Sequence, residues 1–238
     1  MDLVFVLDSS GSIRDGNPKD GSYDNWQLLL NFVVNVISEL RISEDDTRVG
    51  IVKFSDIGEK IFYLNTYYNK EDMIDAVRRI SYVGSNTNTV GGLRKMKYNQ
   101  FQRDNGDRDD VADVAVVITD GFSTINSQQT IPEAADAQRS EIRMYAIGIT
   151  NKTNLEEVKM LSSDPRQEGT DYWRSKDFTT LDDILSNLVN TLCSTAVISD
   201  GEMMIKLLYA FGCTVTQVAK QDVKAVLLTS VACSLQWP

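Results

Sequence analysis

Oxygen-bearing side chains stand directly after two apolar runs of this sequence and again in a loop between them. Asp8, Ser10 and Ser12 form an alternating carboxylate and hydroxyl set after the first run. Asp120 follows the second run, and Thr87 stands in a loop rich in hydroxyl and amide side chains. If both runs are neighbouring parallel strands, the two carboxylates reach the same sheet edge, where ligands of open α/β sheets bind.

Asp8 and Asp120 would repel each other in one crevice, and the repulsion would raise the pKa of one of them unless a cation lay between them. Carboxylate and hydroxyl oxygens, without cysteine or histidine, favour Mg²⁺, Mn²⁺ or Ca²⁺ over zinc or copper. Because such a site has few anionic ligands, the ion keeps a net positive charge and an exchangeable position. An acidic residue of a partner protein can bind there, which predicts adhesion.

The composition excludes several other chemistries. The 238 residues include no histidine, which removes Ser-His-Asp and Cys-His nucleophile systems and most catalytic zinc sites. With 24 Lys+Arg against 34 Asp+Glu the net charge is −10, which argues against nucleic acid or an anionic membrane as the main partner. No uncharged stretch is long enough to span a bilayer as a helix. We therefore expect a non-enzymatic binding protein with no direct membrane span.

The elements that position these residues alternate between apolar runs and segments of helical spacing, as in βαβ units. We expect an α/β fold, a doubly wound (Rossmann-like) three-layer sandwich with a mostly parallel six-stranded sheet, helices on both faces and one antiparallel edge strand. The expected strands are residues 2–7, 48–54, 59–64, 112–119, 142–149 and 171–174. The expected helical segments are residues 26–40, 73–80, 93–96, 131–135, 155–161 and 179–193.

One domain over residues 2–195 and a separate tail over 196–238 are the expected organisation. The tail breaks the alternating pattern and carries two apolar patches without a partner strand or helix. The acidic stretch 103–110 is interpreted as a solvated loop, because it lacks the ligand spacing of an EF-hand.

Three motifs in order resemble the von Willebrand factor type A domain and its metal-ion-dependent adhesion site. They are Asp8-x-Ser10-x-Ser12, Thr87 within Gly-x-Asn-Thr-Asn-Thr, and Thr119-Asp120-Gly121-x-Ser123. Segments 146–149, 161–165 and 178–193 further resemble the collagen VI and matrilin type of matrix module. The resemblance runs from residue 2 to about residue 194.

This resemblance implies that Asp8, Ser10, Ser12 and Thr87 supply the inner oxygens of a bound Mg²⁺, with Mn²⁺ or Ca²⁺ as alternatives. It implies that Asp120 holds a coordinated water. The implied partner is an extracellular matrix or cell-surface protein that presents an acidic residue. The implied location is extracellular, although no signal peptide is visible in the chain.

The sequence departs from the family pattern at two places. Residues 13–25 include an extra polar stretch, which we expect to overhang the metal crevice; it either shapes the ligand surface or is a tolerated insertion. Cys193 matches the closing cysteine of the family, whose common partner stands before the first strand and is absent here, so we infer a fragment or a shortened product. Cys193 could instead pair with Cys213 or Cys233.

Two alternative functions stay open on the sequence alone. One is a structural matrix module with a non-functional metal site. The other is a Mg²⁺-dependent hydrolase in which Asp8 accepts a phosphoryl group, although such phosphatases usually carry an acid where this chain has Ser10. An intracellular location also stays open, since type A domains occur in cytosolic assemblies.

Overall fold

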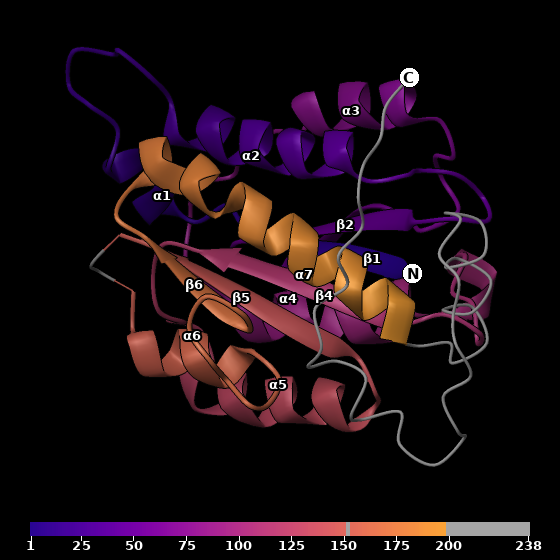
Figure 1. Cartoon of the computed structure of the whole chain (residues 1–238). Coiled ribbons are helices and arrows are strands. Elements are labelled where there is room, and N and C mark those ends of the chain that lie inside the picture. Colours follow the sequence, from indigo (N-terminus) through magenta and orange to yellow (C-terminus); the bar gives the residue numbers. More distant parts are fainter. Residues whose placement is uncertain (151–152, 199–238) are drawn as a thin grey trace.

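The computed structural model describes residues 1–150 and 153–198 of the chain. At its centre lies a six-stranded sheet in the order β3-β2-β1-β4-β5-β6 (Figure 1). The strands are β1 (Asp2–Asp8), β2 (Arg48–Phe54), β3 (Gly58–Phe62), β4 (Asp113–Thr119), β5 (Arg143–Ile149) and β6 (Tyr172–Ser175). Only the β2–β3 pair is antiparallel among these strands. The expected fold class is confirmed, including the antiparallel edge strand.

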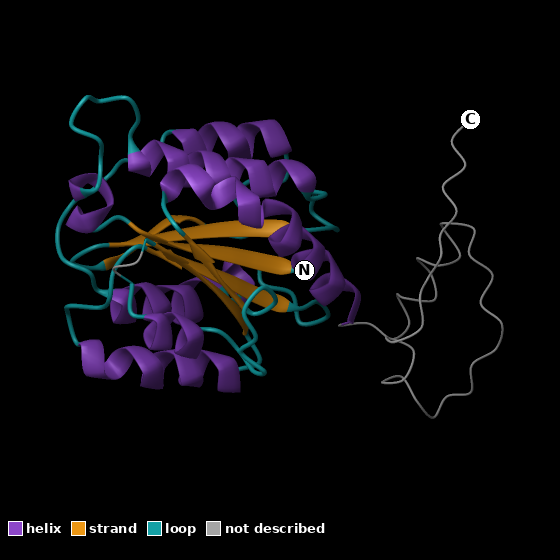
Figure 2. Cartoon of the chain, turned by 60° about the vertical axis from the view of Figure 1, so that its left-hand side comes forward, coloured by secondary structure: helices purple, strands orange, loops and turns teal. Residues whose placement is uncertain are grey.

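Helices cover both faces of the sheet, which makes it the middle of three layers (Figure 2). The helices are α1 (Gly11–Asp15), α2 (Asn25–Glu39), α3 (Lys70–Arg78), α4 (Thr89–Lys95), α5 (Thr130–Arg139), α6 (Leu155–Leu161) and α7 (Leu185–Ile198). The core shared with α2, α3 and α7 contains Phe5 of β1, and the core shared with α4, α5 and α6 contains Val4 and Val6. Alternate residues of β1 thus feed opposite cores, which explains its continuous apolar sequence.

The carboxyl ends of three strands meet at one edge of the sheet. Asp8 at the end of β1 pairs with Phe54 at the end of β2, and Leu7 pairs with Ile118 of β4. The strand order reverses at β1, because β2 and β3 lie on one side of it and β4, β5 and β6 on the other. Loops after β1 and β4 therefore meet at a topological switch point, the usual place for a ligand in this class of fold.

The prediction of one continuous helix over residues 179–193 is wrong for the first part of this range, which forms a different type of helix. Residues Phe178–Ile184 form a 3₁₀ helix, and α7 begins only at Leu185. Phe178, Leu181 and Ile184 are all buried. Their spacing of three places them on the same side of a helix with three residues per turn, so the 3₁₀ form buries all three side chains.

Two expectations concern the ends and surroundings of the domain. No helix in the described part of the chain combines the length and apolarity needed to cross a bilayer.

The tail expected over residues 196–238 lies outside the described residues from 199 onward, so its separation from the domain stays a prediction.

Candidate metal centre

The turn after β1 carries three of the five expected site residues. Asp8 is fully buried at the end of the strand, and the backbone N–H of Ser10 donates a 2.8 Å hydrogen bond to its Oδ1. The hydroxyl oxygens of Ser10 and Ser12 lie 3.1 Å apart. Because α1 begins at Gly11, this turn is fixed between a buried strand and a helix.

The turn after β4 contacts these side chains directly. Ser12 Oγ donates a 2.6 Å hydrogen bond to Asp120 Oδ1, and Thr119 Oγ1 donates one of 2.6 Å to Asp8 Oδ2. A Cβ atom added to Gly121 would lie 3.5 Å from Ser12 Oγ, in ordinary van der Waals contact, so Gly121 lies beside this serine. The two turns form one hydrogen-bonded network because β1 and β4 are neighbours.

Thr87 lies in a third loop that is joined to both turns through backbone groups. The N–H of Gly11 donates to the carbonyl of Ser85 over 2.7 Å, which ties this loop to the turn after β1. The N–H of Thr87 donates to Thr124 Oγ1 over 3.0 Å, which ties it to the turn after β4. The structure thus places Thr87 at the same end of the sheet as the other four site residues. Those four, Asp8, Ser10, Ser12 and Asp120, are linked to one another by side-chain contacts.

Burial dominates the electrostatics of this edge. Removal from water raises the pKa of the Asp8 carboxyl, and hydrogen bonds from Ser10 and Thr119 act in the opposite direction. On α6, burial also raises the pKa of Glu157, and the negative charge of Asp8 adds to that effect. Buried carboxylates that lie close together repel each other when they are charged. A divalent cation bound between them offsets this repulsion.

The donor set fits a hard divalent cation. The five side chains offer only carboxylate and hydroxyl oxygens, which suit Mg²⁺, Mn²⁺ or Ca²⁺. Ser12 Oγ lies within hydrogen-bond distance of both Ser10 Oγ and Asp120 Oδ1, so three of the donor side chains already meet in one place.

Three residues at this edge were not assigned a role from the sequence. Thr119 could have been found, because it stands beside Asp120 at the end of a predicted strand. Glu157 accepts a 3.0 Å hydrogen bond from the N–H of Ser123 but lies on a helix far along the chain. The hydroxyl of Tyr82 donates to the carbonyl of Ser10 over 2.8 Å. No spacing in the sequence signals the last two contacts.

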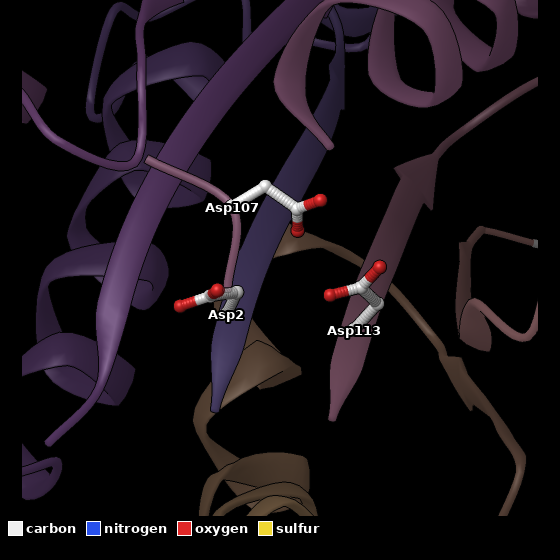
Figure 3. Close-up of side chains that lie close together, drawn as sticks. All are labelled: Asp2, Asp107 and Asp113. Atoms are coloured by element: carbon white, nitrogen blue, oxygen red, sulfur yellow. The ribbon is translucent and has the colours of Figure 1, made fainter. Parts of the chain in front are cut away.

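A separate acidic cluster lies where β1 and β4 begin, at the end of the sheet opposite the candidate metal centre. Carboxylate oxygens of Asp2, Asp107 and Asp113 lie within 4.8 Å of one another, and Figure 3 shows the carboxylates of Asp107 and Asp113 turned toward each other. Burial and the charge of Asp107 raise the pKa of Asp113 to about 8. Arg108 pairs with Asp2, and only 14% of its side chain is exposed. The interpretation of residues 103–110 as a solvated loop is therefore wrong for Asp107 and Arg108.

Cys193 is exposed on α7, and it forms no disulfide with another residue of the described part of the chain. The candidate partners Cys213 and Cys233 lie outside the described residues. The disulfide expectations for this cysteine therefore stay predictions.

A doubly wound sheet with an oxygen-rich cluster at its switch point defines the class, an α/β ligand-binding domain. The family model of the von Willebrand factor type A domain matches residues 2–187, and the chain belongs to this family. The family resemblance inferred from the three motifs is confirmed.

Similar proteins include matrix proteins. Matrilin-1 of Gallus gallus is 31% identical over 194 residues, which are 81% of this chain and 36% of the relative. The collagen alpha-6(VI) chain of Mus musculus is 30% identical over 196 residues, or 81% of this chain and 8% of the relative. The chain thus spans about a third of the length of matrilin-1.

A solved structure with the same fold is that of proximal thread matrix protein 1 from the mussel byssus, with a zinc-occupied metal-ion-dependent adhesion site. Its TM-score is 0.71 at 24% sequence identity, and the match covers 81% of this chain and 45% of that chain. This likeness shows the fold.

Proposed function

We propose that this domain binds protein partners through a metal ion. Asp8, Ser10, Ser12 and Thr87 hold a divalent cation directly, and Asp120 holds it through a water molecule. The observation that carries the proposal is the 2.6 Å contact between Ser12 Oγ and Asp120 Oδ1, because it brings ligands from two strands together. The proposed unit is the domain over residues 2–195, with residues 196–238 as a separate tail.

The proposed ion is Mg²⁺, with Mn²⁺ or Ca²⁺ as alternatives, because all the side-chain donors are hard oxygens. When bound, the ion supplies a Lewis-acidic position that accepts a carboxylate. The zinc-occupied site of the byssus protein supports a divalent ion in this family of sites.

The residues of the chain prepare this position in advance. Asp8 is held by hydrogen bonds from Thr119 Oγ1 and from the N–H of Ser10, so its orientation is fixed before any ion arrives. With Asp8 as the only carboxylate in direct contact, the ion keeps a net positive charge. That charge favours an acidic residue of the partner over a neutral one.

Exposed apolar side chains on neighbouring loops support a binding face here. Ile57 is 70% exposed, Phe122 is 55% exposed and Val83 is 48% exposed. Phe122 follows the turn after β4, and Ile57 lies in the turn between β2 and β3, whose Asp56 accepts a 2.7 Å hydrogen bond from Asn86. Contiguous exposed apolar patches rimmed by polar residues are typical of interaction surfaces, and these side chains are the candidates for such a patch beside the metal centre.

The proposed partner is an extracellular matrix or cell-surface protein that presents an acidic residue beside apolar ones. The matrilin and collagen relatives support an extracellular location for this chain. These relatives also support a binding role in place of catalysis by Asp8.

Selection of displayed random peptides on the full chain tests the proposal. The peptides are bound in MgCl₂ and eluted with EDTA. We expect every enriched peptide to contain Asp or Glu and to lose binding to the Asp8→Asn variant. Asp20→Asn, an exposed carboxyl in the loop between α1 and α2, is the matched control and should bind normally. Enriched peptides without an acidic residue, or equal binding to Asp8→Asn, would contradict the proposal.

A further inference from the structure

Tyr82 connects two of the three loops at the metal centre. It precedes the loop that carries Thr87, and its hydroxyl donates to the carbonyl of Ser10 over 2.8 Å and to that of Gly11 over 3.2 Å. These carbonyls belong to the turn that presents the Ser10 and Ser12 hydroxyls. One side chain therefore fixes the backbone of this turn from the neighbouring loop.

The ring of Tyr82 is held on one side by α2. Its centroid lies 5.8 Å from that of Trp26, and Trp26 Nε1 donates a 2.9 Å hydrogen bond to the carbonyl of Ile80. Gly84 has φ +82°, and a Cβ atom there would lie 2.7 Å from Tyr82 Cε1. The chain thus folds closely over the ring, and glycine provides both the space and the positive φ that this path requires.

The extra polar loop between α1 and α2 is tied to the same ring. Arg14 Cζ lies 4.4 Å from the Tyr82 centroid. Arg14 also donates to both carboxylate oxygens of Asp24, over 3.1 Å from Nε and 2.6 Å from Nη2. Asp24 closes the loop, since its side chain accepts a 3.1 Å hydrogen bond from the N–H of Trp26. Figure 1 shows this loop projecting beyond α1 and α2.

We propose that Tyr82 is a positioning residue for the metal-binding turn, and that the Arg14–Asp24 pair couples the extra loop to this turn through the Tyr82 ring. The inference rests on the proposed function, but it concerns residues that do not touch the ion. It proposes a role for the extra loop that the sequence did not suggest, namely structural support of the metal centre.

The physical reason is preorganisation. Without the Tyr82 hydroxyl, the carbonyls of Ser10 and Gly11 lose a donor, and the turn samples orientations in which the serine hydroxyls do not converge. Metal binding must then restore that order. Partners that orient metal ligands from outside typically contribute about 10- to 100-fold to metal affinity.

The test measures the Mn²⁺ dissociation constant of the full chain by electron paramagnetic resonance for three variants. Tyr82→Phe removes only the hydroxyl, and Arg14→Gln removes the cation. Tyr68→Phe is the matched control, because that ring contacts Arg48 at the other end of the sheet. Hydrogen exchange of the Gly11 amide in metal-free protein is the second measurement.

We expect about tenfold weaker Mn²⁺ binding for Tyr82→Phe and about threefold weaker binding for Arg14→Gln, with Tyr68→Phe unchanged. The Gly11 amide should exchange faster in metal-free Tyr82→Phe. Normal Mn²⁺ affinity of Tyr82→Phe would overturn the positioning role, and normal affinity of Arg14→Gln would overturn the coupling to the loop.

A wild-type chain that binds no Mn²⁺ would refute the proposed function instead. In that case the Gly11 amide decides the positioning role by itself. Faster exchange in Tyr82→Phe than in wild type supports it, and equal exchange overturns it.

Discussion

Thr119 Oγ1 donates a 2.6 Å hydrogen bond to Asp8 Oδ2, which joins the carboxyl ends of β4 and β1 across 111 positions of the sequence. Both side chains are buried. Asp8 therefore depends on a neighbouring strand for one of its partners. The candidate metal centre is a property of the assembled sheet rather than of the turn after β1 alone.

Replacement of Thr119 by Val should destabilise the metal-free protein by about 1–3 kcal/mol, because a buried carboxylate oxygen loses its donor while the shape is kept. Urea unfolding in EDTA measures this change. Thr191→Val is the matched control, since its hydroxyl is exposed on α7 and donates only to Asn187 O. An equal loss of unfolding free energy in Thr119→Val and Thr191→Val would show that the hydrogen bond from Thr119 to Asp8 adds no stability of its own.

Arg108 compensates a buried charge at the other edge of the sheet. Its Nε and Nη2 donate to Asp2 Oδ1 over 3.0 Å and 2.7 Å, and Asp2 is fully buried. Arg108→Met removes the guanidinium and leaves Asp2 with the backbone N–H of residue 108 as a donor, so it should cost about 3–5 kcal/mol of unfolding free energy. Arg103→Met should cost at most about 1 kcal/mol, because the Arg103–Asp109 pair is exposed. Urea unfolding of both variants side by side provides the test, and a loss below about 1 kcal/mol for Arg108→Met would refute it.

The unfolding free energy should fall with rising pH because of Asp113. Burial and the Asp107 charge raise the pKa of Asp113 in the folded protein to about 8, so the folded chain binds this proton more tightly than the unfolded chain. The resulting stability is fully present below about pH 4 and is lost as the pH rises through about 8. The charged groups that act on Asp113 include Asp2, Asp107 and the N-terminal ammonium of Met1, which lowers the pKa against the other two.

Melting temperatures at pH 5 and pH 9 test this dependence against Asp113→Asn, which does not titrate at position 113. The fall in Tm between the two pH values should be smaller in the variant by at least about 2 °C. Asp56→Asn is the control, since Asp56 is an exposed carboxyl at the opposite edge whose pKa is lowered by hydrogen bonds. Parallel Tm curves for wild type and Asp113→Asn would contradict the assignment.

The positions of site residues that directly follow a strand were predictable from the sequence. Asp8, Ser10 and Ser12 follow an apolar run directly, and parallel strands end at a common edge, so their meeting with Asp120 follows from the fold class. The strands β1, β2, β4 and β5 were predictable because each is a short, nearly continuous apolar run bounded by polar residues. The signals for β3 and β6 were weaker, since their sequences, GEKIF and YWRS, mix polar with apolar residues.

Contacts made by long side chains between distant elements were not predictable. Arg108 stands in an acidic stretch, and only the assembled sheet shows that it pairs with buried Asp2. Tyr82 and Glu157 reach the metal centre from a loop and a helix whose positions depend on packing against the sheet. The 3₁₀ segment before α7 was also missed, because an apolar spacing of three is compatible with an α-helix as well.

Thermal unfolding of the full chain with and without Mg²⁺ tests the central claim most directly. The protein is melted in EDTA and then at increasing MgCl₂, beside an Asp8→Asn/Asp120→Asn variant shown by circular dichroism to be folded. At about 100 times the Kd, a bound ion should add roughly 2.7 kcal/mol and raise Tm by about 5–10 °C in the wild type alone. A wild-type Tm that does not respond to Mg²⁺, or an equal rise in the variant, would contradict a metal centre formed by Asp8 and Asp120.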